Sequence, residues 1–88
     1  MTTCTAVGIA FKNPAFKAAC EKARDAVESG ESTDEKVSFI LDGIQYAYGY
    51  RCRYDEEMQG YDVFPVYYAG RRIRPGRYFG PKKPFIIR

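Results

Sequence analysis

Residues 37–54 read VSFILDGIQYAYGYRCRY and contain the strongest fold signal in the chain. Apolar and aromatic residues alternate with other residues on both sides of Asp42-Gly43. This dipeptide is typical of the two-residue turn of a β-hairpin, because both turn positions take a positive φ. With that turn, every opposed pair on one face of the hairpin is apolar or aromatic, as a register with one buried face requires. These pairs are Leu41 with Ile44, Phe39 with Tyr46, and Val37 with Tyr48.

A helix is the competing prediction for the same residues. Ser32 and Glu35 resemble a capping box, and apolar residues after it also recur at helical spacing. A helix would hold Gly43 and Gly49 in its interior at about 1 kcal/mol each, and it would contain many aromatic residues of weak helix propensity. We favour the hairpin and place its second strand, residues 44–54, near the middle of the sheet.

Two further elements are predicted before the hairpin. Residues 2–11 are rich in Thr, Val and Ile and alternate, which predicts a strand. Asn13-Pro14 is typical of a helix start, because asparagine accepts a free amide of the first turn and proline suits the first helical position. An apolar stripe followed by Gly30 then predicts a helix over residues 14–29.

Short strands and turns are predicted after the hairpin. Residues 61–68 are expected to form a strand in which Pro65 requires an edge position or a bulge. Ala69-Gly70 predicts a second turn with a return strand at residues 71–74, and residues 85–87 predict a short final strand.

These elements predict the α+β fold class. The chain of 88 residues is expected to form one small domain, residues 1–88, with a mainly antiparallel sheet and one helix packed on one face. The expected order is strand, helix, strand, strand, strand, and residues 75–88 are expected to form a semi-extended basic arm. We also expect Gly43→Val to destabilise the protein far more than Gly70→Ala, because a β-branched residue is strained at a left-handed turn position.

The charge is distributed unevenly along the chain. Residues 1–62 carry seven Lys or Arg and all eleven Asp or Glu, a net of −4, whereas residues 63–88 carry seven Lys or Arg and no acid, a net of +7. Such a local excess creates a positive potential that the total charge of +3 conceals. Either an anionic partner or the acidic remainder of the domain is expected to compensate it.

The residue types do not indicate catalysis or metal binding. The chain has no His, which excludes Ser-His-Asp and Cys-His catalysis and His-bearing zinc sites. Cys4, Cys20 and Cys52 lack the close pair typical of structural zinc, and their odd number does not match a secreted disulfide framework. Adjacent carboxylates at residues 55–57 are expected to form a solvated turn. We therefore expect no enzyme activity, no cofactor and no metal.

The sequence leaves the role of one group of tyrosines open. In the predicted hairpin they share one face of the second strand, where they either pack beneath the helix or form an exposed surface for stacking or for a protein partner. They are Tyr46, Tyr48, Tyr50 and Tyr54.

The basic, tyrosine-rich C-terminal third is the best candidate for function. Arginine donates planar, bidentate hydrogen bonds to phosphate or carboxylate, and interleaved tyrosine rings add contact area. In size and composition the chain is similar to small phage-encoded inhibitors of host defence or transcription. We predict a non-enzymatic protein that binds, and inhibits or modulates, an acidic protein or nucleoprotein surface. The predicted partner-binding residues are Arg71, Arg72, Arg74, Arg77, Tyr67, Tyr68 and Tyr78, with a possible second patch at Arg51 and Arg53.

Three alternatives remain open from the sequence. The same residues also suit direct binding of DNA or RNA, with arginines on phosphates and tyrosines on bases. A structural role as an oligomer, a homodimer included, would use an exposed sheet edge near Pro65. The arginines would have no partner to bind if the acidic part of the domain neutralises them. No apolar run reaches the ~18 residues of a membrane span, and no signal segment is evident, so we expect a cytoplasmic protein without a membrane partner.

Overall fold

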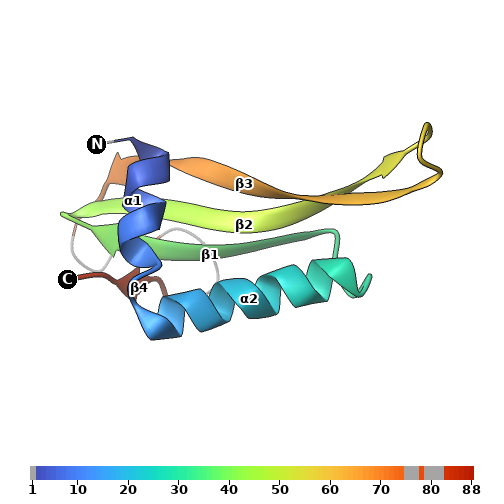
Figure 1. Cartoon of the computed structure of the whole chain (residues 1–88). Coiled ribbons are helices and arrows are strands. Elements are labelled where there is room, and N and C mark those ends of the chain that lie inside the picture. Colours follow the sequence, from blue (N-terminus) through green and yellow to red (C-terminus); the bar gives the residue numbers. More distant parts are fainter. Residues whose placement is uncertain (1, 75–77, 79–82) are drawn as a thin grey trace.

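A computed structural model describes residues 2–74, 78 and 83–88 and contains two helices and one four-stranded sheet (Figure 1). The strands lie in the order β3-β2-β1-β4, with only β4 parallel to its neighbour. The predicted α+β class is confirmed. The elements are α1 (Thr3–Ala10), α2 (Pro14–Glu28), β1 (Asp34–Leu41), β2 (Ile44–Asp55), β3 (Gly60–Arg72) and β4 (Phe85–Ile86).

The N-terminal segment is a helix, so the strand predicted for residues 2–11 is wrong. Thr2 caps α1, because its hydroxyl accepts a hydrogen bond from the Thr5 amide at 3.1 Å. Ala6, Val7 and Ala10 fall on one helical face and are buried against the sheet. Burial of this face overrides the local strand preference of Thr, Val and Ile. The element order therefore begins with two helices.

The central hairpin and the helix before it are confirmed. Asp42 and Gly43 have φ values of 54° and 74°, and the strands pair in the predicted register from Leu41 with Ile44 outward. β2 lies between β3 and β1, as predicted for residues 44–54. Helix α2 begins after Asn13, whose side chain accepts a hydrogen bond from the amide of Phe16 at 3.1 Å.

Strand β3 continues without a turn to Arg72, so the return strand predicted for residues 71–74 is wrong. The register shifts at a bulge in β3, where Ala69 and Gly70 lie opposite the single residue Tyr46 of β2, and β3 stays paired with β2 to Arg72. A Cβ atom at Gly70 would overlap the ring of Tyr46, which is buried there. A Cβ atom is thus unfavourable at both glycines, at Gly43 because of its positive φ and at Gly70 because of this overlap, and the larger cost expected for Gly43→Val stays a prediction. Pro65 lies in an edge strand, as predicted.

The end of the chain docks on the sheet. β4 pairs in parallel with β1 through Phe85 and Ile86, and Ile87 is buried. The semi-extended arm expected for residues 75–88 is therefore wrong for residues 85–87. Residues 75–77 and 79–82 of that arm lie outside the residues that the structure describes.

Both helices pack on the same side of the sheet, which we call the helix face. α2 packs on β1 and β2, and α1 crosses the strands at the end where β3 finishes (Figure 1). The core is largely aromatic. Phe16 of α2 is fully buried, with ring centroids 5.0 Å from Phe39 and 5.8 Å from Phe85. We call the opposite side of the sheet, which neither helix covers, the open face.

The tyrosines of β2 divide along the strand. Tyr46 and Tyr48 are each 6% exposed and belong to the core, whereas Tyr54 is 51% exposed. Tyr50 is intermediate, and the Tyr48 hydroxyl donates a hydrogen bond to the Tyr50 hydroxyl at 3.1 Å. The interpretation as core is therefore confirmed for Tyr46 and Tyr48, whereas Tyr54 is exposed and its role as a partner surface stays a prediction. No helix among the described residues is long and apolar enough to cross a membrane.

Candidate anion-binding surface

The open face gathers side chains from three strands. The pairing places Lys36 beside Gly49, and Gly49 beside Val66, in one row across the sheet. Residues two positions along each strand share a face, so Arg51 and Tyr68 flank this row. Gly49 has no side chain, which leaves its neighbours room to lean toward one another.

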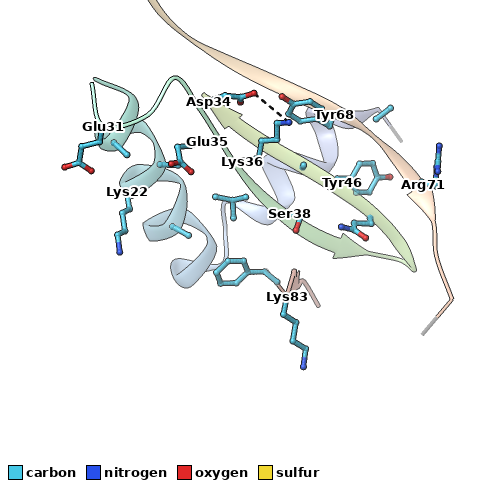
Figure 2. Close-up of a pocket in the computed structure, with 18 residues that line it drawn as sticks. Lys22, Glu31, Asp34, Glu35, Lys36, Ser38, Tyr46, Tyr68, Arg71 and Lys83 are labelled. Carbon is cyan, nitrogen blue, oxygen red and sulfur yellow. Dashed lines mark ion pairs between the residues drawn. The ribbon is translucent and has the colours of Figure 1, made fainter. Parts of the chain in front are cut away.

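Four of these side chains form a connected cluster. The Arg51 Nη2 atom donates hydrogen bonds to Asp34 Oδ2 at 3.2 Å and to the Tyr68 hydroxyl at 3.3 Å. The Lys36 Nζ atom lies 3.8 Å from Asp34 Oδ2 and 4.7 Å from the centre of the Tyr68 ring. Figure 2 shows Lys36, Asp34 and Tyr68 together on this side of β1, while Glu35 points toward α2.

The cluster carries an excess of positive charge. One carboxylate, Asp34, is shared by two cations, and all three groups are substantially exposed. The hydrogen bond with Asp34 raises the pKa of the Arg51 guanidinium above its ordinary value, so Arg51 stays charged. Exposed ion pairs of this kind are weak. Asp34 therefore holds Arg51 and Lys36 only weakly, and both cations stay accessible to solvent.

An open hollow of ≈ 1130 Å³ extends from this cluster along the edge of β1. Its lining carries residues of both charges, and Lys22 and Lys36 lie near the acidic residues. In Figure 2 the carboxylates of Glu31, Asp34 and Glu35 lie toward one end, and Arg71 and Lys83 lie away from them. Alanines of α2 line the helix side, which keeps the hollow wide.

The structure brings together only part of the predicted site. Tyr68, Arg51 and Arg71 border the open face or its hollow. Tyr67 lies on the helix face, where its ring centroid is 5.0 Å from that of Tyr48. Arg53 is exposed, in register with Asp62.

The remaining predicted residues lie at or beyond the end of β3. Arg72 is the last residue of β3, pairs with Ile44 and is exposed, and Arg74 follows it, also exposed. Tyr78 is partly buried, and Arg77 lies outside the described residues. Ion pairs between described residues include Arg24 with Glu28, and Lys36 and Arg51 with Asp34.

Sequence reasoning missed Lys36 and Asp34. The signal was present, because the predicted hairpin already places Lys36 opposite Gly49 and therefore diagonal to Arg51. Tyr68 was found, but its approach to Lys36 depends on the register of β3, which the sequence does not specify.

The thiols differ in exposure and in protonation. Cys4 is exposed, Cys52 is intermediate and Cys20 is buried in the core. Burial raises the pKa of the Cys20 thiol from its ordinary value of 9.0 to about 12, so this group stays protonated at neutral pH. Among the residues that the structure describes, no group of three or more Cys, Asp or Glu is placed to hold a metal ion.

No protein family, curated protein or solved structure matches the chain. The functional argument therefore depends on the geometry of the surface.

Proposed function

We propose that this chain is a small non-enzymatic binding protein that holds an anionic protein or nucleoprotein surface against its open face. Binding would inhibit or modulate the partner by occupying that surface. The observation that supports the proposal is the cluster of Arg51, Lys36 and Tyr68, which lies on a sheet face that neither helix covers. Arginine and tyrosine are the side chains enriched in energetically dominant interface positions.

The cluster is partly organised before any partner binds. Tyr68 contacts both cations, and Asp34 holds them within reach of one acceptor. A partner carboxylate or phosphate thus meets donors that have already lost part of their rotational freedom, which lowers the entropic cost of binding. Arg71 extends the basic surface toward the end of β3 and the hollow.

Charge reversal tests this proposal. The double variant Arg51→Glu/Arg71→Glu is expected to lose capture of the partner from an extract of the native host, as read by affinity purification and mass spectrometry. With the purified partner, we expect affinity to fall by at least about tenfold, since each reversal replaces attraction by repulsion. Arg24→Glu is the matched control, because Arg24 is an exposed arginine of α2 that pairs only locally with Glu28. Equal capture by the double variant and the control would contradict the proposal.

Direct nucleic-acid binding is the second candidate function. Tyr68 lies beside Lys36 and Arg51, and Phe64 is on the same sheet face, an arrangement that suits stacking of unpaired bases over a basic sheet. Fluorescence anisotropy with single-stranded DNA and RNA probes distinguishes this candidate from protein binding. If the chain binds nucleic acid, a plot of the logarithm of the binding constant against the logarithm of the salt concentration should have a slope of about −0.7 for each phosphate contacted. Absence of binding at low salt would exclude it.

The structure lends less support to oligomer formation along the sheet edge. β3 is an edge strand, but Pro65 has no amide hydrogen to donate to an added strand. The sheet edge near Pro65 is therefore a weaker candidate for a partner site than the open face.

A further inference from the structure

The strands β2 and β3 continue as a two-stranded arm away from the end that α1 crosses (Figure 1). Three residue pairs of this arm lie on the same face, each two residues further along the strands. They are Tyr50 with Pro65, Cys52 with Val63, and Tyr54 with Tyr61. We call the helix-face side of the arm the aromatic shelf. Its residues are Tyr50, Cys52, Tyr54, Tyr61, Val63, Pro65 and Tyr67.

The two faces of the arm differ sharply in charge. Every residue of the aromatic shelf is uncharged, whereas the open face of the same arm carries Arg51, Arg53 and Asp62. Strict alternation of this kind is specified where one face is buried, because a charged residue there would be costly. The alternation persists to the pair Tyr54 and Tyr61, next to the β2–β3 turn.

Tyr50, at the inner end of the aromatic shelf, packs against the core, but no described helix covers the outer part of the shelf. Tyr54, Tyr61 and Tyr67 are 51%, 74% and 46% exposed. α2 packs on β1 and β2, and α1 meets β3 only near its far end, so the outer part of β3 has no second layer (Figure 1). A sheet face of this composition is half of a two-layer arrangement.

The exposed area of the aromatic shelf is large enough to form a substantial part of an interface. At roughly 200 Å² for a whole tyrosine side chain, these three rings alone leave about 350 Å² accessible. Interfaces of standard size bury about 800 Å² on each partner, and the rest of the shelf and the turn supply further surface. Single patches of a few hundred Å² on small proteins commonly mark interaction sites.

The charges around the shelf indicate which partner fits. The turn at the end of the arm carries Glu56 and Glu57, both exposed. At the opposite end of the helix face, exposed Lys12 precedes α2 and exposed Lys17 lies in its first turn. Lys17 borders a small hollow of ≈ 260 Å³ whose other charged residues are Glu21 and Arg24, so Lys12, Lys17 and Arg24 outnumber the one acid here. An antiparallel second copy would bring the acidic turn of each chain toward the basic helix start of the other.

We propose that the aromatic shelf is the interface of a two-fold symmetric homodimer, in which the shelves of two copies pack face to face. In an isologous contact the same surface of each copy faces the other, and two uncharged surfaces can meet without repulsion between like charges. Sheet-on-sheet packing spaces the layers about 10 Å apart, which leaves room for the partner's arm beside α1 and α2. This contact does not involve the open face, so it is independent of the proposed function.

Light scattering after size-exclusion chromatography, together with sedimentation equilibrium, tests the proposal. We expect the wild-type chain to show a concentration-dependent monomer–dimer equilibrium. Tyr54→Glu/Tyr61→Glu is expected to raise the dimer dissociation constant at least about a hundredfold, because two-fold symmetry places each substitution in the interface twice. Arg53→Glu is the matched control, since it adds an acidic residue to the same arm but on the open face, and its dimer should persist.

Circular dichroism checks that the variants keep the native spectrum. Tyr61 is exposed enough that its substitution is expected to leave the fold intact. If the double glutamate variant fails to fold, the milder Tyr61→Ser decides, with an expected weakening of about tenfold. A wild-type chain that stays monomeric at all concentrations overturns the proposal, and so does a dimer that survives both substitutions or that Arg53→Glu dissociates.

Discussion

Gly49→Ala probes a close approach between the backbones of β1 and β2. Gly49 lies in β2 between Lys36 of β1 and Val66 of β3, and a Cβ atom at this position would overlap the carbonyl of Glu35 and the Cα atom of Lys36. These are backbone atoms of a paired strand, so they cannot rotate away as a side chain can. The methyl group must therefore push β1 from β2, close to the open-face cluster.

The expected cost follows from two opposing terms. Forcing an extra methyl group into a packed region costs up to about 3 kcal/mol, and the upper value applies here because backbone has to move. Replacing glycine by alanine recovers about 0.5–1 kcal/mol of conformational entropy in the unfolded chain. The net loss is about 2 kcal/mol, which lowers Tm by roughly 8–16 °C for a domain of this size.

Thermal and urea unfolding followed by circular dichroism measure this loss. Gly8→Ala is the matched control, because Gly8 lies inside α1 and a Cβ atom there has no neighbour within 4 Å. In a helix interior alanine is favoured over glycine by about 1 kcal/mol, so the control should be more stable than wild type. If Gly49→Ala matches or exceeds wild-type stability, the close approach of β1 and β2 is wrong.

Three further outcomes are expected. Asn13→Ala should lower the free energy of unfolding by about 1 kcal/mol in urea titrations, because the hydrogen bond to the Phe16 amide is lost, while Asn13→Asp should retain most of it. In the native protein a thiol reagent should label Cys4 rapidly and Cys20 only after unfolding, and equal rates would contradict the buried position of Cys20. The raised pKa of Cys20 also makes stability depend on pH: the folded state keeps this proton between pH 9 and about 12 while the unfolded state loses it, so the free energy of unfolding should fall as pH rises through this range. Pairwise comparison with Cys20→Ala should show a shallower decline, and an identical slope would refute the assignment.

The hairpin and α2 were predictable because their signals are local. Asp42-Gly43 forces a tight turn at one point, and the alternation on both sides then leaves one favourable register. Asn13-Pro14 likewise begins α2 through contacts within one helical turn. In each case the physical cause lies within a few residues of its effect.

The candidate surface was predictable only in part. Tyr68, Arg51 and Arg71 came from composition and charge, whereas Tyr67 was assigned to the same site and lies on the opposite face. Adjacent residues of a strand point to opposite sides, so a cluster in sequence is necessarily split by a strand. Lys36 joined the cluster because β1 and β3 both pair with β2.

The amino-acid sequence by itself determined the α+β class, the central hairpin with its register, α2 and the separation of acidic from basic residues along the chain. Only the tertiary structure decided that residues 3–10 form a helix, that β3 stays paired with β2 past Gly70, and which tyrosines are buried. Local preferences at those positions are nearly balanced, with differences below about 1 kcal/mol per residue. Packing against distant segments is worth more than that, so contacts between residues far apart in the chain determine the outcome.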